Sequence, residues 1–244
     1  MKITDINVSI GGRNAGGTAV TAAELIRQMD LYEIGHAVCW HEYALSDPKE
    51  GNSLMREAAD ASGGRLGVSA ILDPVLGAES LPGEGTLTER ILALKPESLH
   101  IFPDNARTVF HPLYWEEILE AADKLALPLI VDCDYKEPFF YALPEVSRLY
   151  PRVKFVLVRY GLCRSRHIFP LLEKRDNIYL TLEHLLDDQQ IEEICGRGQD
   201  GKLFFASSYP KLPFTGPLGL ALYADVSAEA KEKLLWKNWE AVRG

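Results

Sequence analysis

Charged residues stand where short apolar runs of this sequence end, and two of them could carry acid–base or anion-binding chemistry. The run PLIVD from Pro128 ends in Asp132, and KFVLV from Lys154 is followed by Arg159. Both side chains are costly inside a core unless they are paired or solvated. An ion pair between them is the structural interpretation, because partly buried charges are found in pairs. The functional interpretation is that the planar guanidinium of Arg159 binds an anion such as a carboxylate, and the two are compatible.

Polar residues also follow the other apolar runs, and together they could form one site. A general base is needed to activate water, and Asp132, Asp134 and Glu183 are the acids best placed for it. Arg159, helped by Arg13 or Arg107, would stabilise developing negative charge, and Ser208 is a second candidate, as a nucleophile. We predict catalytic roles for Asp132, Arg159, Glu183 and Ser208, and substrate-binding roles for Asn7, Ser9, His41, His100, Asp134 and Tyr209.

A scaffold that gathers strand ends is required, and the chain repeats a unit that supplies one. Apolar runs rich in β-branched residues start about every 28 residues, which suits one strand, one helix and two loops. The eight runs cover residues 3–10, 34–40, 66–72, 98–102, 128–133, 154–160, 177–182 and 202–207. Eight such units in about 250 residues predict an α/β fold, a (β/α)8 TIM barrel in which the chemistry sits at the C-terminal strand ends. We expect one domain over residues 1–244.

The segments between the runs have helical periodicity. Residues 113–126 place five apolar residues on one face, namely Trp115, Ile118, Leu119, Ala122 and Leu125. An open doubly wound sheet is the alternative fold, but the sequence after the first run, IGGRNAGG, lacks the GxGxxG spacing of its phosphate-binding turn. In the last helix, Trp236 and Trp239 are expected to pack under the barrel, with an oligomer contact as the alternative.

Composition limits the partners. The net charge of −9 and the scattered basic residues argue against nucleic acid. Four cysteines stand far apart with no CxxC pair, which predicts reduced thiols. The N-terminus lacks the apolar core of a secretory signal and no segment reaches about 20 apolar residues, so we expect a cytoplasmic protein without a membrane partner. A small anionic molecule is the expected ligand, and a homo-oligomer stays open.

Several segments resemble the amidohydrolase superfamily, specifically its amidohydrolase-related branch of metal-dependent TIM-barrel hydrolases. ITDINVSIGG resembles the family's first strand, in which an Asp precedes a His-x-His pair. LALPLIVDCDY and YPRVKFVLVRYG resemble the fifth and sixth strand segments, each of which ends in a His. LFFASSYP resembles the eighth, Gly-Ser-Asp-x-Pro, and EKLLWKNWEAVRG resembles the C-terminal helix. These segments occur in the family's order between residues 3 and 244.

The family's metal-binding residues are all replaced. Asn7 and Ser9 stand at the His pair, Asp132 at the fifth-strand His, Arg159 at the sixth-strand His and Ser208 at the catalytic Asp. A guanidinium cannot be deprotonated to bind a cation, so we expect a degenerate site without the family's divalent metal, which is typically zinc. As a hypothesis, Arg159 supplies a fixed positive charge there and Asp132 orients or balances it. An atypical metal site from Asp132, Asp134 and Glu183, with nitrogen from His100 or His184, is the alternative.

Three functions follow from these observations. The first is a metal-independent hydrolase or lyase acting on a small carboxylate-bearing substrate, which the resemblance permits because some lactonases of the superfamily dispense with metal. The second is a non-catalytic barrel that binds a small anion or a partner subunit, since fold alone does not guarantee activity. The third is an atypical metal-dependent hydrolase that uses Asp132, Asp134 and Glu183.

Overall fold

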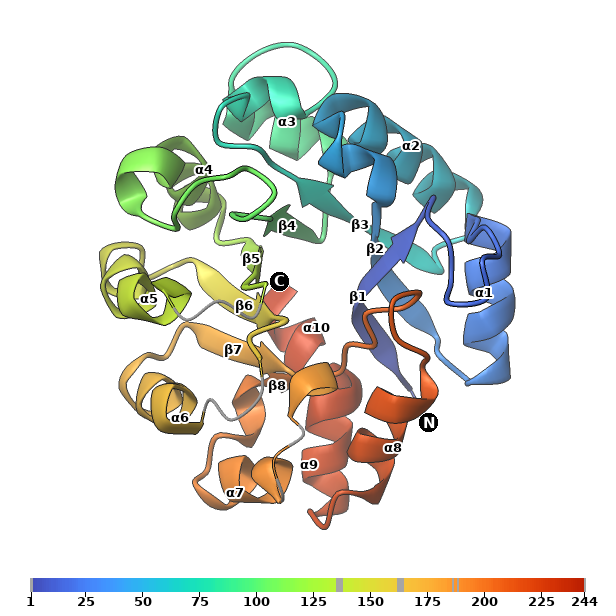
Figure 1. Cartoon of the computed structure of the whole chain (residues 1–244), viewed down its shortest axis with the longest axis vertical. Coiled ribbons are helices and arrows are strands. Elements are labelled where there is room, and N and C mark those ends of the chain that lie inside the picture. Colours follow the sequence, from blue (N-terminus) through green and yellow to red (C-terminus); the bar gives the residue numbers. More distant parts are fainter. Residues whose placement is uncertain (1, 135–137, 162–164, 186, 188, 244) are drawn as a thin grey trace.

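The computed structural model describes residues 2–134, 138–161, 165–185, 187 and 189–243. Eight parallel strands follow one another around a barrel in chain order, each paired with the next (Figure 1). They are β1 (Thr4–Ile10), β2 (His36–His41), β3 (Leu66–Ile71), β4 (Ser98–Ile101), β5 (Pro128–Asp132), β6 (Lys154–Val158), β7 (Ile178–Thr181) and β8 (Leu203–Phe204). Each lies within one of the eight runs expected from the sequence, except that β2 extends one residue further, to His41.

The first and last strands meet through bonds outside the regular ladder. The amide of Ile6 donates to the carbonyl of Phe205 at 3.1 Å, and the amide of Ser208 donates to the carbonyl of Asn7 at 3.0 Å. One carboxylate oxygen of Asp5 also accepts from the amide of Ser207 at 3.0 Å. These contacts complete a (β/α)8 barrel, which confirms the predicted fold.

Helices surround the strands in Figure 1. The helices after the eight strands are α1 (Ala22–Leu31), α2 (Pro48–Ala61), α3 (Leu87–Leu94), α4 (Pro112–Leu125), α5 (Pro138–Leu149), α6 (Ser165–Lys174), α7 (Gln190–Gly196) and α8 (Thr215–Tyr223). Helix α4 buries Trp115, Ile118 and Leu119 as its spacing predicts, and it begins with Pro112 in the first turn, where a missing amide proton is harmless. The chain ends in α9 (Ala228–Glu232), a π-helical turn (Lys233–Lys237) and α10 (Asn238–Arg243).

The barrel interior is apolar near α10 and polar toward the carboxyl ends of the strands. Ile6, Val38, Ile130, Val156 and Phe204 come from five strands and pack with Trp239 of α10. The ring of Trp239 meets that of Phe204 edge-on at 5.7 Å, and α10 crosses the centre of the barrel in Figure 1. Trp239 therefore packs under the barrel as expected, whereas Trp236 is only partly buried.

Two findings bear on the expected surroundings of the chain. Among the described residues, no helix is both long enough and apolar enough to cross a membrane. Cys39, Cys133 and Cys195 are free thiols. Cys163 lies outside the described residues.

Candidate functional site

Asp132 and Arg159 form an ion pair at the carboxyl ends of β5 and β6. The Nε of Arg159 lies 2.9 and 2.8 Å from the two oxygens of Asp132, and its Nη2 lies 2.7 Å from Oδ1. The same Nη2 lies 2.9 Å from a carboxylate oxygen of Asp134. Burial raises the pKa of Asp132, and the hydrogen bond from Arg159 opposes this effect. The predicted pairing is confirmed, and Arg159 is shared between two carboxylates.

Three residues at the mouth have a left-handed backbone. The φ angle is 43° at Asp134, 49° at Arg159 and 56° at Ser208. Residues with a Cβ adopt this region at a cost of about 1–3 kcal/mol, and such positions cluster at functional sites. The turn at each position redirects the chain as it leaves the strand, which makes the mouth a strained part of the barrel.

A chain of hydrogen bonds runs from β2 to the turn after β7. Trp40 Nε1 donates to Asn7 Oδ1 at 3.4 Å, Asn7 Nδ2 donates to Ser208 Oγ at 3.2 Å, and Ser208 Oγ donates to Glu183 Oε1 at 3.3 Å. Glu183 is buried, and its other oxygen has no hydrogen-bond partner among the described residues. Asn7 and Ser208 are thus brought together as predicted, while Glu183 lies beneath Ser208.

Two buried acids share this region. Burial raises the pKa of Glu183 to about 8 and that of Asp5 to about 7, and the negative charge of Asp5 raises the pKa of Glu183 further. Hydrogen bonds from Ser207 lower the pKa of Asp5 but do not cancel the effect of burial. A proton is therefore held in this pair near neutral pH.

The two predicted histidines take different positions. His100 is buried, and neither ring nitrogen has a hydrogen-bond partner in the part of the chain that the structure describes. Its ring stacks on Phe102 at 4.3 Å and meets Trp40 edge-on at 5.9 Å, and burial lowers its pKa well below the ordinary value. His41 instead caps the turn after β2 by accepting from the amide of Tyr43 at 3.2 Å. Gly11 has a φ of 84° and lies so close to the His41 ring that a Cβ would fall 2.3 Å from it.

Ser9 and Tyr209 line the centre of the mouth. Ser9 Oγ donates to Glu42 at 3.0 Å, and the ring of Tyr209 stacks on Phe214 at 4.6 Å. The cavity that they line is about 10 Å³, which is room for about one water molecule at most. It is bounded by Asn7, Ser9, Trp40, Asp132, Arg159, Ser208, Tyr209 and Lys211. The centre of the mouth is therefore almost filled by side chains.

Larger spaces lie to one side of this centre. A cavity of about 150 Å³ is lined by Asp132, Asp134, Arg159 and Lys211, together with residues of the loop after β4. A neighbouring cavity of about 730 Å³ lies between that loop and α5 and is lined by Phe110, Phe139 and Tyr141, among others. Asp132 and Asp104 line both. Asp132 also lines the central cavity, so it faces all three spaces.

Lys211 is a mouth residue that the sequence did not reveal. It lies in the loop after β8, and its ammonium group lies 5.5 Å from the centre of the Trp40 ring. Its position three residues after Ser208 was the available signal, but a lysine in a loop is normally a solvated surface residue. The lysine belongs to both cavities that contain Arg159.

The donors at the mouth do not fit a divalent cation. Asp132 and Asp134 both hold the guanidinium of Arg159, and Glu183 lines none of the mouth cavities. Within the described part of the chain, no three His, Cys, Asp or Glu side chains are grouped so that they could hold a metal ion. The side chain of His184 lies outside that part. An amide, a hydroxyl and a guanidinium are poor ligands for zinc or manganese.

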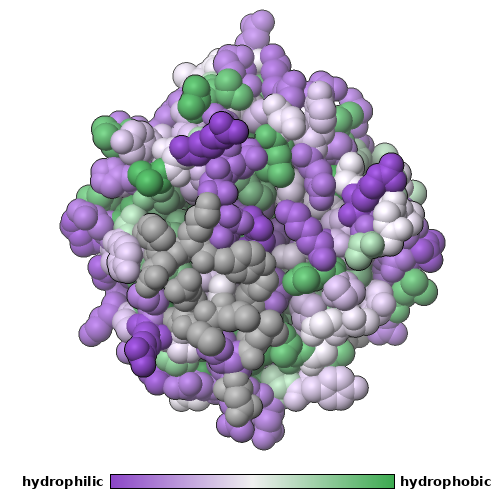
Figure 2. Space-filling view, in the orientation of Figure 1, coloured by the Kyte–Doolittle hydropathy of each residue, from purple (hydrophilic) through white to green (hydrophobic). Residues whose placement is uncertain are grey.

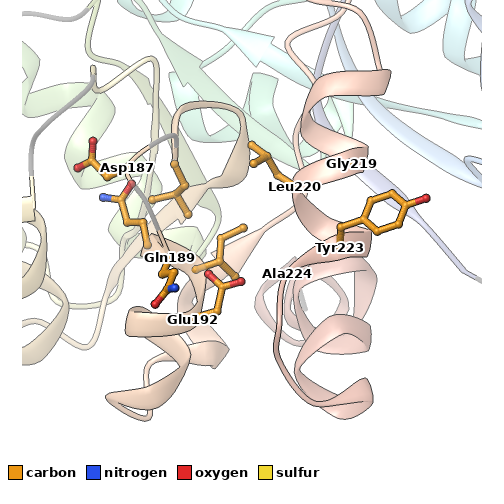
Figure 3. Close-up of a pocket in the computed structure, with 10 residues that line it drawn as sticks. Asp187, Gln189, Glu192, Gly219, Leu220, Tyr223 and Ala224 are labelled. Carbon is orange, nitrogen blue, oxygen red and sulfur yellow. The ribbon is translucent and has the colours of Figure 1, made fainter.

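A separate cavity of about 390 Å³ lies between α7 and α8 (Figure 3). Leu220 and Tyr223 border it on α8, and Glu192 borders it on α7. None of its lining residues lines a mouth cavity or was predicted from the sequence.

Figure 2 shows hydrophilic side chains gathered near the centre of the face that it displays, with apolar residues scattered around them.

Comparisons with known proteins identify the fold. An uncharacterized TIM-barrel protein from Bordetella bronchiseptica superposes with a TM-score of 0.77 at 14% identity, covering 99% of this chain and 98% of that one. The 5-carboxyvanillate decarboxylase from Sphingomonas paucimobilis gives 0.73 at 12% identity, with 99% and 98% covered. A dihydroxybenzoic acid decarboxylase from Polaromonas sp. JS666, solved with bound manganese and 2-nitroresorcinol, gives 0.70 at 14%, with 99% and 96% covered.

The chain therefore has the TIM-barrel fold of these proteins, which structures named as amidohydrolases also share. The resemblance noted in the sequence is confirmed at this level. No family model and no curated protein matches the sequence.

Proposed function

We propose that this chain is a hydrolase or lyase that acts on a small carboxylate-bearing substrate at the barrel mouth, without a divalent metal. The observation that carries the proposal is the position of Asp132, which faces all three mouth cavities while paired to Arg159. The fold shared with decarboxylases supports a lyase or hydrolase that acts on carboxylates.

Asp132 is the group we assign as general base. Its raised pKa makes its carboxylate a stronger base than an exposed one, and the adjacent cavities leave space for a water molecule or a substrate. In a hydrolysis, Asp132 would take the proton of the attacking water and return it to the leaving group. Arg159 would balance the negative charge of Asp132 and hold its orientation through the three short contacts.

Ser208 is the second candidate for the reacting group. Its hydroxyl lines the central cavity, donates to Glu183 and accepts from Asn7. Once it is ionised, above its raised pKa of about 8, Glu183 could accept the proton as Ser208 attacks a carbonyl, which follows the general logic of a nucleophile next to a base. The left-handed backbone of Ser208 supports this alternative, because strained turns present nucleophiles in other hydrolases.

The test is turnover with and without metal. Purified protein is assayed on panels of esters, lactones, amides and decarboxylation substrates that carry a carboxylate, in excess chelator, and its metal content is measured by mass spectrometry. We expect turnover that survives chelation and falls at least about 100-fold in Asp132→Asn, because removal of a general base costs on this order. Ser208→Ala separates the two candidate groups. Turnover that requires about one equivalent of zinc or manganese would contradict the metal-free proposal.

A non-catalytic anion-binding barrel is the second candidate function. The almost filled central cavity favours it, because it leaves little room for a reacting substrate beside Ser208. Stabilisation of the fold by carboxylates, with no turnover across the panels, would support this function in place of an enzyme.

A further inference from the structure

We infer that Lys211, seated over Trp40, is the anchor for the carboxylate of the ligand and defines an anion subsite in the 150 Å³ cavity. This inference rests on the proposed function, because it names how the same site recognises its substrate. It departs from the expectation that Arg159 plays this role.

Acidic side chains already surround Arg159. Its guanidinium contacts Asp132 and Asp134 at 2.7–2.9 Å, so two acids surround one cation. The guanidinium already engages two carboxylates, which weakens its attraction for an incoming carboxylate. An anion in the adjoining cavity therefore needs a further positive charge.

Lys211 supplies that charge. It lines the cavity with Asp132, Asp134 and Arg159. No carboxylate partner of Lys211 is found within the described residues, and its ammonium lies over the face of the Trp40 ring. The positive charge of Lys211 also acts on Asp132 and His100, which shows that its field reaches the interior of the mouth.

Trp40 holds the ammonium of Lys211 in a defined position, because its own ring is fixed. The indole is buried, donates to Asn7 and packs against Phe102 at 5.0 Å. A cation over such a ring is attracted by the negative face of the ring. The N–H groups of the ammonium stay available to a ligand, because the ring face is not an oxygen acceptor.

The size of the cavity limits the ligand. About 150 Å³ corresponds to the liquid volume of about five water molecules. A carboxylate with a short body fits this space, and a larger apolar group would extend past Asp132 and Asp104 into the 730 Å³ cavity. The subsite therefore takes the carboxylate end of a small organic acid.

Binding measurements test the inference without requiring turnover. Malonate, benzoate and inorganic phosphate are titrated calorimetrically into wild type, Lys211→Met and Lys211→Arg, with Lys49→Met as a control that removes an exposed lysine of α2. We expect at least one carboxylate to bind wild type. Its Kd should rise at least ten-fold in Lys211→Met and about two- to four-fold in Lys211→Arg, which keeps the charge but changes the donor geometry. Lys49→Met should bind as wild type does.

The outcomes separate this inference from the proposed function. Equal carboxylate binding by wild type and Lys211→Met would overturn the role of Lys211 and leave the proposed function standing. Binding of phosphate in preference to every carboxylate would overturn the assigned ligand class. A wild-type protein that binds neither acid would overturn the anion subsite, whereas turnover on the substrate panels decides the proposed function independently. Circular dichroism of each variant identifies any loss of affinity that comes from misfolding.

Discussion

At the scale of single residues, the mouth of the barrel combines an ion pair with a lysine for which the described residues offer no carboxylate partner. Asp132 and Arg159 neutralise each other at the ends of β5 and β6, while Lys211 stays without a carboxylate among the described residues. A divalent cation would require the opposite arrangement, with acids and imidazoles directed at one point. The residues therefore favour recognition of an organic anion by an ammonium group.

Glu183 gives a prediction about pH. The pKa of Glu183 in the folded state is about 8, which lies above the usual value of an exposed Glu. The folded state therefore binds this proton more tightly than the unfolded state does. The resulting stabilisation is complete in acid and is lost as pH rises through about 8. The variant Glu183→Gln does not lose stability in this way, because its amide does not titrate. We expect the free energy of unfolding of wild type to fall by about 2 kcal/mol more than that of the variant between pH 6 and pH 9. Urea unfolding at both pH values measures it.

The control for this prediction is Glu57→Gln, which changes an exposed Glu of α2. Its pH dependence should match that of wild type. If Glu183→Gln loses stability with pH as steeply as wild type does, Glu183 is not the group that titrates.

Most of the polar residues that gather at the mouth could be predicted from the sequence, but not all of their neighbours or their burial. The alternation of strand side chains predicts that Asn7 and Ser9 share a face, and the neighbouring runs predict the pairing of Asp132 with Arg159. Lys211 could not be predicted, because the path of a loop after a strand depends on tertiary contacts. The burial of Glu183 also could not be predicted, since it depends on a turn at Leu182–His184 that tucks the side chain beneath Ser208.

At the scale of elements, strand periodicity carried the prediction of the fold. The runs from Ser98 and Lys154 became β4 and β6 because their apolar residues pack on both faces, as parallel strands require. The expected run 202–207 contains a strand of only two residues, Leu203–Phe204. Beyond Phe204 the chain leaves the ladder and bonds to β1 through single contacts, which a pattern of apolar residues does not specify.

Asn52 shows how a helix fixes a strand end. Its buried side chain in α2 donates to the carbonyls of Ile71 and Ser80 at 2.8 and 2.9 Å and accepts from the amide of Ile71 at 2.9 Å. We expect Asn52→Ala to lower the free energy of unfolding by about 3 kcal/mol, because it leaves buried backbone groups without partners. Chemical denaturation measures this loss.

Ser53→Ala is the matched control on the same helix. Its hydroxyl donates to the carbonyl of Lys49 one turn earlier, and this is its one side-chain hydrogen bond among the described residues. A change within about 0.5 kcal/mol is expected there. Equal losses in the two variants would show that Asn52 does not tie α2 to β3.

At the scale of the whole molecule, the C-terminal helix completes the barrel by filling its interior from one end. Trp239 is buried against residues of five strands, and its Nε1 lies 3.4 Å from Glu97. We expect Trp239→Ala to lower the free energy of unfolding by about 3–5 kcal/mol, as large deletions in a core do. Trp236→Ala, which removes a partly buried ring, should cost about 1 kcal/mol through its lost contact with Lys2.

Thermal and urea unfolding of the two Trp variants distinguish these roles. A larger loss in Trp236→Ala than in Trp239→Ala would contradict the packing of Trp239 inside the barrel. Size-exclusion chromatography of both variants also tests the alternative that these residues form an oligomer contact, because only an interface residue would change the assembly without lowering stability.

The closure between β1 and β8 has a consequence for how binding and folding are linked. The central cavity is lined by Asn7 and Ser9 on one side of this junction and by Ser208 and Tyr209 on the other. The junction itself depends on a few backbone bonds and on the Asp5 carboxylate. A molecule that contacts both sides would add contacts across this junction. Binding at the mouth would then make local opening of the barrel less favourable. A tighter ligand would raise the free energy needed to separate the first strand from the last.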